Sequence, residues 1–332
     1  MQNRDNSQFR VLLTGASGYL AGHIQNIILV RGYKIRGTVR SLKNHKKIDH
    51  IYQTNPALKQ NLELVEADLC SKECWNSIMK DVDFVIHTAS PFPQKIPKDE
   101  DELIKPEVLG TEAIFESALR NGANCHAYEK SQNLGEKKAW EIFEKNKQKI
   151  QLIVILPGFI KGPSYHTNDY TSADFILKTM KNELPGIPKV SMAIVDVRDC
   201  ALAHMIALNQ EKLEAKNGKR YILIEDSYWM YDLIQILKDE FAQYNYKFPS
   251  FTVESKFLLS LAGCIDKQVE MIKPNFQRRA VFDNTPAMKE LGIIFRGHRN
   301  TIVKFAYDLI NKGCIPNKLP KNVQVSPILE KN

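Results

Sequence analysis

A glycine-rich run near the N-terminus has the residue types and the spacing of a phosphate-binding turn. Residues 11–22 read VLLTGASGYLAG, an apolar stretch followed by Gly15, Gly18 and Ala21 at intervals of three. Gly15 permits a tight turn, Gly18 lets the backbone approach a pyrophosphate, and Ala21 is small enough for a helix to pack against the strand. Anions bind at a helix N-terminus because its amide groups and its dipole are positive there. Since strand, turn and helix follow one another, the run predicts a dinucleotide-binding turn.

The end of the second predicted strand bears on which dinucleotide would bind. About 20 residues after the glycines, a site for NAD carries Asp or Glu to hold the ribose 2′-hydroxyl. This chain reads GTVRS over residues 37–41, with Lys43 close behind and no carboxylate. The Arg40 guanidinium could pair with a 2′-phosphate through two parallel hydrogen bonds, so the sequence favours NADP. The alternative is an ordinary exposed arginine at the end of a strand.

The elements that must position this turn alternate between strand-like and helical patterns. Strands are predicted at residues 10–14, 34–40, 62–66, 84–88, 151–156, 193–197 and 220–224. Helices are predicted between them at residues 19–31, 74–79, 104–121, 127–147 and 199–208. This alternation is typical of βαβ units, so the predicted fold class is α/β, a doubly wound parallel Rossmann sheet. The pattern then becomes helical, at residues 231–244, 257–261 and 301–310.

Composition and charge limit the classes of partner. The 332 residues carry a net charge of +8, and 43% of them are hydrophobic, as in ordinary globular chains. The lysines are spread along the sequence rather than gathered with aromatics, which argues against nucleic acid; a modest positive field for a phosphorylated cofactor is the alternative to plain solvation. No stretch approaches the roughly 20 apolar residues of a membrane span, and the first ten residues are polar. We therefore expect a cytoplasmic protein with no membrane partner.

The six cysteines give no sign of a metal centre. They form no CxxC pair, and no histidine stands at metal-ligand spacing from them. Reduced and mostly buried thiols fit a reducing compartment, and no metal site is predicted.

Further short motifs are spread along the chain after the glycine-rich run. They are EADL at residues 66–69, HTASPF at 87–92, GT at 110–111, AYEKS at 127–131, LPG at 156–158, GP at 162–163, VDVRD at 195–199 and ELG at 290–292. Taken together with residues 14–22 and 37–41, they resemble the extended short-chain dehydrogenase/reductases, the NAD-dependent epimerase/dehydratase family. The resemblance is strongest to the dihydroflavonol 4-reductase and cinnamoyl-CoA reductase-like branch.

This resemblance implies a Rossmann sheet carrying NADP (NADPH), with a smaller and mostly helical C-terminal cap around a small-molecule carbonyl substrate. The chemistry of the family is hydride transfer from NADPH to a ketone or an aldehyde. A Tyr donates the proton, a Lys four residues later lowers its pKa, and a Ser or Thr orients the carbonyl. The implied cofactor contacts are Gly15, Ser17, Gly18, Tyr19, Leu20, Ala21, Arg40, Lys43, Asp68, Leu69, Thr88, Ala89, Ser90, Pro157 and Gly158.

Tyr128 matches the catalytic tyrosine of the family, but its surroundings depart from the family's pattern. The lysine expected four residues later is Gln132, which could hydrogen-bond the ribose but brings no charge. Lys130 does not replace it easily, because residues i and i+2 point to different sides of a helix. A phenol needs a nearby cation to exchange protons near neutral pH, so we expect weakened catalysis. His126 is interpreted as a surface residue at a helix start, with a substitute base as the alternative.

The strand that should precede the Tyr128 helix also has no place in the predicted pattern. The gap lies near residues 122–126, where only Ala123, Asn124 and Cys125 are clearly left between two predicted helices. A strand needs about 5–6 residues in addition to its loops. The sequence therefore predicts a sheet with one central strand fewer and a displaced Tyr128 helix.

The predicted organisation is a Rossmann domain over residues 8–225 and a substrate cap over 226–316, interleaved with the 159–193 segment. Residues 317–332 are predicted to form a loose tail. The leading hypothesis for the function is an NADP-dependent carbonyl reductase with weakened catalysis. The alternatives are a catalytically inactive NADP-binding pseudoenzyme and a truncated gene product. A monomer and a homodimer are both compatible with the sequence.

Overall fold

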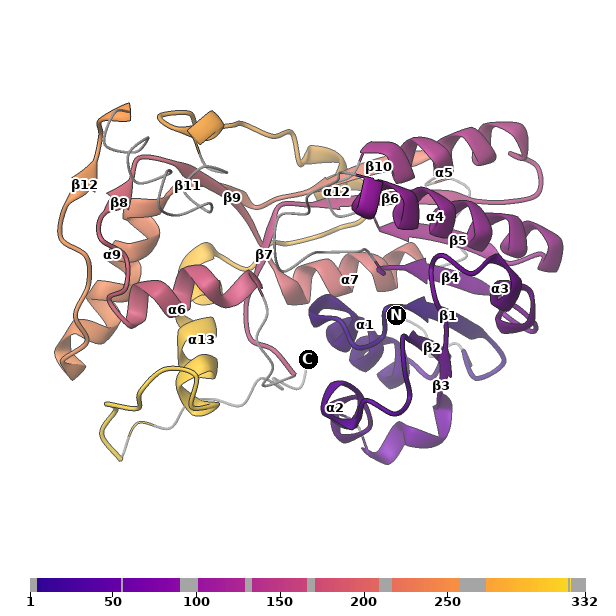
Figure 1. Cartoon of the computed structure of the whole chain (residues 1–332), viewed down its shortest axis with the longest axis horizontal. Coiled ribbons are helices and arrows are strands. Elements are labelled where there is room, and N and C mark those ends of the chain that lie inside the picture. The colour runs from indigo at the N-terminus through magenta and orange to yellow at the C-terminus, as the bar shows by residue number, and fades with distance from the viewer. Residues whose placement is uncertain are drawn as a thin grey trace. The chain divides into compact units, whose positions relative to one another are not determined.

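The computed structural model of the chain describes residues 5–54, 56–89, 101–128, 133–165, 171–208, 217–256, 273–321 and 323. The chain divides into two compact units, which are drawn together in Figure 1. The first comprises Met1–Leu156, Cys200–Ile222 and Thr285–Ile293, and the second comprises Pro157–Asp199, Leu223–Asn284 and Ile294–Asn332. Each unit has its own hydrophobic core.

A seven-stranded sheet forms the centre of the first unit. Its strands lie in the order β10-β6-β5-β4-β1-β2-β3, and every pairing from β3 through to β6 is parallel. The chain builds outward from β1 to β3 and then crosses to β4 on the other side of β1, which makes the carboxyl end of β1 a topological switch point. The predicted doubly wound α/β fold is thereby confirmed. The strands are β1 (Arg10–Thr14), β2 (Lys34–Val39), β3 (Leu62–Glu66), β4 (Phe84–His87), β5 (Asn124–Tyr128), β6 (Leu152–Pro157) and β10 (Lys219–Leu223).

Helices cover both faces of this sheet, with α4 and α5 side by side on one face and α1 on the other (Figure 1). Ile114 and Ala118 of α4 are four residues apart on one helix face, and they pack with Val85 and Val154 of the sheet in the core. The helices are α1 (Tyr19–Val30), α2 (His45–Thr54), α3 (Lys72–Ile78), α4 (Asp101–Asn121), α5 (Asn133–Lys145) and α12 (Thr285–Glu290), with a short 3-10 helix at Pro56–Asn61. Helix α7 (Val197–Ala207) begins in the second unit and continues in the first.

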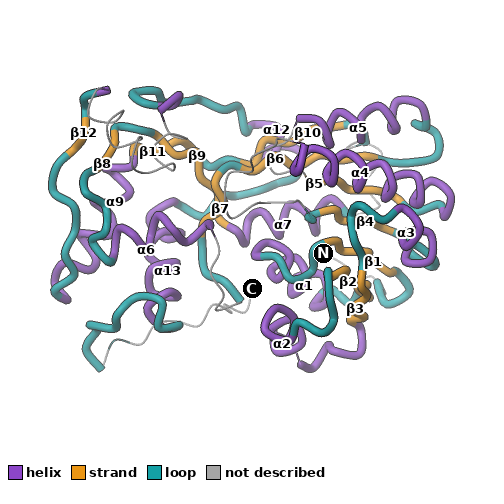
Figure 2. Tube along the Cα trace, in the orientation of Figure 1, coloured by secondary structure: helices purple, strands orange, loops and turns teal. Residues whose placement is uncertain are grey.

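The prediction of a missing central strand is wrong. Asn124–Tyr128 forms β5, which pairs with β4 on one side and with β6 on the other (Figure 2). Room for this strand exists because α4 ends sharply: Gly122 takes a left-handed φ of 72°, and the Ala123 amide bonds back to the Ala118 carbonyl. In addition, α5 begins at Asn133 rather than near residue 127. Five residues are enough for a central strand.

The second unit contains two small sheets and three helices of seven or more residues among its described residues. Strand β9 (Ser191–Asp196) pairs antiparallel with β11 (Asp226–Trp229) and parallel with β7 (Phe159–Lys161), and β8 (Ile187–Pro188) pairs with β12 (Thr252–Val253). The helices are α6 (Asp174–Met180), α9 (Met230–Phe241) and α13 (His298–Asn311), with short 3-10 helices at Thr171–Ala173, Ala242–Tyr244 and Lys273–Asn275. Leu237, Phe241 and Phe305 lie in its core. The helix predicted at residues 257–261 lies outside the described residues.

None of the helices that the structure describes is both long enough and apolar enough to span a lipid bilayer. A search of the same residues for three or more His, Cys, Asp or Glu side chains grouped around one point finds none.

Candidate functional site

The turn between β1 and α1 has a geometry that only glycine can supply at Gly15. Gly15 has a left-handed φ of 68°, and a Cβ atom built there would lie 2.9 Å from the Ala89 Cα. Gly18 is the N-cap of α1, and a Cβ atom there would lie 3.1 Å from the Gly15 carbonyl oxygen. The absence of a side chain at both glycines therefore lets the backbone of the turn pack closely against its neighbours.

Two residues that the sequence did not single out hold this turn in place. Thr38 of β2 accepts the Gly15 amide on its hydroxyl over 3.2 Å and the Ala16 amide on its carbonyl over 2.9 Å. Gln25 of α1, which is buried, donates to the Ala16 carbonyl over 2.5 Å. Gly37 lets β2 come this close, since a Cβ atom there would lie 2.8 Å from the Ala16 Cβ. The turn is thus fixed by the protein itself before any ligand binds.

The N-terminus of α1 suits an anion. No side chain caps this twelve-residue helix, and its first turn holds no acidic residue. A pyrophosphate placed there would meet amide groups and the positive end of the helix dipole. Leu20 and Ala21 are buried and can meet a ligand only through their backbones, whereas Ser17 and Tyr19 are half-buried. The residues of the turn therefore fit the phosphates of a dinucleotide.

Arg40 and Lys43 follow β2 on the same edge of the sheet, and both are exposed. Glu66, at the end of β3, is paired in register with Val39 and brings a carboxylate to this edge. One of its oxygens, however, accepts the Leu42 amide over 2.7 Å. Two cations with exposed side chains and no carboxylate at the end of β2 itself fit a ribose 2′-phosphate better than a bare hydroxyl.

Asp68 and Leu69 come after β3. The Asp68 carboxylate accepts the Cys70 amide over 2.9 Å and shapes the turn into α3, while Asp68 itself remains exposed. Leu69 packs on Gly110 of α4, where a Cβ atom would lie 2.9 Å from the leucine side chain. Leu69 therefore has a packing role in the fold whatever it contributes to a ligand.

Thr88 and Ala89 follow β4 at the same carboxyl edge as the glycine turn. The Thr88 hydroxyl donates to the Thr14 carbonyl over 2.7 Å, which ties this segment to the end of β1. Ser90, predicted to act beside them, lies outside the described residues.

Tyr128, predicted as the catalytic tyrosine, lies in a strand rather than in the expected helix. Tyr128 is the last residue of β5, so its predicted position on a helix is wrong. His126, predicted at a helix start, lies inside the same strand opposite Ile86. The reason is the later start of α5, which leaves Tyr128 in the sheet. Gln132 lies outside the described residues.

Pro157 ends β6, and Gly158 follows it; both are assigned to the second unit. The Gly158 amide donates to the Leu223 carbonyl over 3.3 Å, and a Cβ atom at Gly158 would collide with the Ala193 carbonyl. Close backbone packing inside the second unit is therefore one reason for the glycine.

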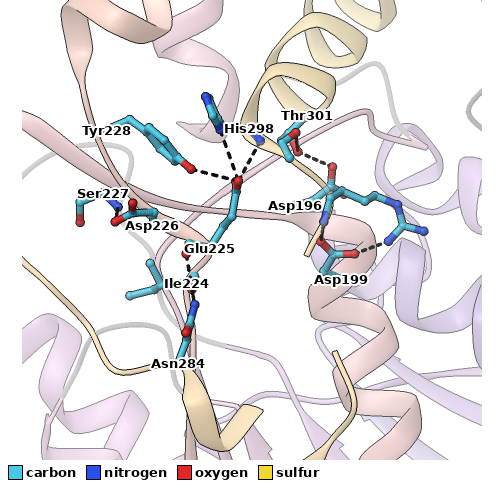
Figure 3. Close-up of polar contacts among 12 residues, drawn as sticks. Asp196, Asp199, Ile224, Glu225, Asp226, Ser227, Tyr228, Asn284, His298 and Thr301 are labelled. Atoms are coloured by element: carbon cyan, nitrogen blue, oxygen red, sulfur yellow. Dashed lines mark hydrogen bonds and ion pairs between the residues drawn. The ribbon is translucent and has the colours of Figure 1, made fainter. Parts of the chain in front are cut away.

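Charged side chains that are largely buried gather in the second unit where β9 runs into α7, next to the start of α13 (Figure 3). Arg198 grips Asp196 with two hydrogen bonds of 2.9 and 2.6 Å, and Thr301 donates to the same carboxylate over 2.8 Å. Burial works against the charge on Asp196, but these bonds hold its pKa below the usual range. Burial, together with the nearby Asp196, raises the pKa of Asp199 to about 6, although Arg296 pairs with it. These contacts fasten the unit internally.

Glu225 caps the start of α13 in the same close-up (Figure 3). One of its oxygens accepts the His298 amide over 3.1 Å, the Tyr228 hydroxyl over 3.0 Å and lies 3.3 Å from His298 Nδ1. The Tyr228 and His298 rings stack with their centroids 3.8 Å apart. Asn284 donates to the Ile224 and Glu225 carbonyls over 2.7 and 3.1 Å. A carboxylate at a helix N-terminus is a stabilising cap, so this cluster has a structural role.

Comparison with known proteins supports a relationship along most of the chain. The model of the NAD dependent epimerase/dehydratase family matches residues 11–138. Cinnamoyl-CoA reductase 1 of Petunia hybrida is 27% identical over 92% of this chain and 93% of its own length. Tetraketide alpha-pyrone reductase 1 of Arabidopsis thaliana is 24% identical over 95% of this chain and 100% of its own length.

The fold is similar to that of yeast methylglyoxal/isovaleraldehyde reductase Gre2, solved in complex with NADPH. The two agree with a TM-score of 0.73 at 22% identity, over 92% of this chain and 100% of the yeast chain. The alignment with the Petunia protein spans 345 positions, more than the 332 residues of this chain. That relative therefore carries positions that this chain lacks.

Proposed function

Because this chain belongs to the extended short-chain dehydrogenase/reductases, the NAD-dependent epimerase/dehydratase family, we propose that it is an NADPH-dependent reductase of a ketone or an aldehyde. The observation that carries the proposal is the glycine turn, which is fixed by Thr38 and Gln25 at the uncapped N-terminus of α1. A turn held in this way loses little freedom when a pyrophosphate binds, and this preorganisation favours affinity.

The proposed roles of the residues follow from their chemistry. NADPH supplies a hydride to the carbonyl carbon. The turn from Gly15 to Ala21 holds the pyrophosphate, and Arg40 with Lys43 holds the 2′-phosphate. Tyr128, at the carboxyl edge of β5, donates the proton to the carbonyl oxygen. Gln132 takes the place of the family's lysine and hydrogen-bonds the ribose without charge, so turnover is slow.

A second candidate is a protein that binds NADP(H) without turnover. The observation that favours it is the neutral Gln132 in place of the lysine, because a phenol without a neighbouring cation is a poor acid near neutral pH. Both candidates share the cofactor site and differ only in catalysis.

Cofactor preference is tested by titrating the full chain with NADPH and NADH while following protein fluorescence. We expect NADPH to bind more tightly by about tenfold or more, since a charge-assisted pair is worth roughly 1.5–3 kcal/mol. Arg40→Ala should remove the preference, and Lys34→Ala, at the opposite end of β2, should leave it intact. Equal affinities in the unaltered protein would contradict the proposed NADP site.

Turnover is tested by following NADPH oxidation with a panel of aliphatic aldehydes, dicarbonyls and cinnamoyl-type aldehydes. Slow but measurable consumption with one class supports the reductase and names its substrate. Binding of NADPH with no consumption across the panel supports the second candidate.

We further propose that residues 8–225 act as the cofactor domain, with 226–316 and the 159–193 segment as the substrate cap and 317–332 as the tail. The protein is proposed to be cytoplasmic and a monomer or a homodimer. Light scattering on the purified chain and fractionation of cells that express it would test these statements.

A further inference from the structure

The hydroxyl of Thr14 joins the two segments that are proposed to hold the cofactor. Thr14 ends β1, immediately before Gly15, and is completely buried. Its Oγ1 accepts the amide of Thr88 and the amide of Ala89, each over 3.1 Å. A single side chain therefore connects the glycine turn with the segment that follows β4.

Among the described residues, the proton of this hydroxyl has one acceptor, the imidazole of His87. His87 lies opposite Thr14 in the β1–β4 pairing, and its Nδ1 is 2.7 Å from Thr14 Oγ1. A hydroxyl has two lone pairs and one proton. Since the amides of Thr88 and Ala89 occupy both lone pairs, Thr14 donates its proton to Nδ1. His87 is therefore neutral, with its own proton on Nε2.

Ala89 is also the residue against which the glycine turn packs. A Cβ atom on Gly15 would lie only 2.9 Å from the Ala89 Cα, so the two backbones are in direct contact. Any shift of the Ala89 amide away from Thr14 would therefore change the backbone contact that supports the glycine turn.

We propose that Thr14 and His87 form a positioning pair for the cofactor. The neutral imidazole orients the Thr14 hydroxyl, and the hydroxyl holds the Thr88 and Ala89 backbone against the glycine turn. Both residues act through that backbone rather than on the reacting atoms. This inference rests on the proposed binding of NADP(H) and adds to it a dependence on the protonation of one histidine.

A protonated His87 cannot take this role. Its Nδ1 would carry a proton and face an oxygen whose two lone pairs are already used, so at least one hydrogen bond of the network would break. Burial lowers the pKa of His87 to about 4, and no charged side chain among the described residues adds to that effect. The contribution of His87 to cofactor affinity should therefore be kept down to about pH 5 and be lost as the pH approaches 4. The 2′-phosphate of NADP⁺ takes up a proton at about pH 6, so this contribution is measured as the difference from a His87 variant at each pH.

The first test reads the tautomer of His87 directly, by nitrogen-15 NMR on the cofactor-free full chain at neutral pH. His204 is a matched control, equally buried but with Nδ1 2.7 Å from the Cys200 carbonyl, which can only accept. The proposal requires the proton on Nε2 in His87 and on Nδ1 in His204. A proton on Nδ1 of His87 would overturn it, and neither result depends on cofactor binding.

The second test measures the dissociation constant of NADP⁺ at neutral pH, below the melting temperature of each variant. Thr14→Val keeps the shape but removes the hydroxyl, and should weaken binding by about tenfold or more. Thr14→Ser restores the hydroxyl and should bind within about threefold of the unaltered chain. Equal binding by the Val and Ser variants would overturn the proposal.

The third test covers the case in which Thr14→Val does not fold. His87→Asn places an amide oxygen near the position of Nδ1, where it can accept from the Thr14 hydroxyl, and it does not titrate. This variant should bind NADP⁺ at pH 7 and lose the additional fall in affinity between pH 5 and 4. An unchanged acid profile in this variant would overturn the role of His87. If the unaltered chain binds no NADP⁺ at any pH, the proposed function fails, and the positioning role fails with it, whereas the tautomer result still stands.

Discussion

Gly15 and Ala89 come so close that a Cβ atom on Gly15 would lie 2.9 Å from the Ala89 Cα. The φ of Gly15 is also left-handed, at 68°. Gly15→Ala should therefore abolish measurable NADPH binding and lower the free energy of unfolding by about 1–3 kcal/mol. Fluorescence titration and urea unfolding would measure the two effects.

Gly32→Ala is the control that has the backbone strain of Gly15→Ala without its steric clash with Ala89. Gly32 has a φ of 86°, but a Cβ atom there would meet nothing within 4 Å. This variant should lose about 1–2 kcal/mol of stability from the left-handed backbone alone and keep its affinity for NADPH. If both variants bind NADPH equally well, the close approach at Ala89 does not matter for the cofactor.

Tyr128 and Gln132 can be tested as the proton donor and its uncharged neighbour. Tyr128→Phe should abolish the carbonyl-dependent oxidation of NADPH while leaving the affinity for NADPH within about twofold. General acid catalysis contributes about 10²–10⁴-fold to a rate. In the chain that keeps Tyr128, Gln132→Lys should raise turnover above that of the unaltered protein by part of this factor, because a lysine lowers the pKa of the phenol. Tyr231→Phe, at an exposed position of α9, is the control. Turnover that survives Tyr128→Phe would show that another group donates the proton.

Glu107 of α4 makes stability depend on pH. It is 4% exposed, its Oε2 has no hydrogen-bond partner among the described residues, and burial raises its pKa to about 7. Between the ordinary value of 4.5 and about 7, the unfolded chain has released this proton while the folded chain still holds it. Folding stability should therefore fall as the pH rises through that window, by on the order of 3 kcal/mol.

Glu107→Gln removes this titration and should be the more stable protein at pH 8, with a flatter stability profile between pH 4.5 and 7. Glu116→Gln on the same helix is the control, because the Glu116 side chain is 44% exposed and forms an ion pair with Arg120 on the surface. Urea unfolding at a series of pH values measures both. Parallel profiles for Glu107→Gln and the unaltered chain would refute the assignment to Glu107.

Glu225 is expected to stabilise the second unit through the start of α13. Glu225→Ala leaves the His298 amide and the Tyr228 hydroxyl without their acceptor, which should cost about 1–3 kcal/mol. Glu254→Ala removes an ion pair between exposed side chains and should change stability by less than about 1 kcal/mol. Thermal unfolding compares them; equal melting temperatures would contradict the capping role.

The sequence by itself determined the parts of this protein that depend on local chemistry. Gly15, Gly18 and Ala21 predict their turn because their spacing requires a strand before it and a helix after it. The apolar runs at residues 10–14 and 84–88 predict strands because buried parallel strands are almost continuously hydrophobic. Residues 62–66, which read LELVE, predict a strand through their apolar positions at alternate residues. All three lie where they were predicted, within one residue.

Only the tertiary structure decided β5 and the contacts around the turn. Asn124–Tyr128 reads NCHAY, which is short and lacks the continuous apolar run of a buried central strand, so pairing with β4 and β6 is what makes it one. For the same reason, Tyr128 lies at the end of this strand and not in the helix that the sequence predicts. Thr14 and His87 are 73 residues apart in the chain, and Gly15 and Thr38 are 23 apart. No local pattern encodes such pairs, because they meet only when parallel strands bring their carboxyl ends to one edge of the sheet.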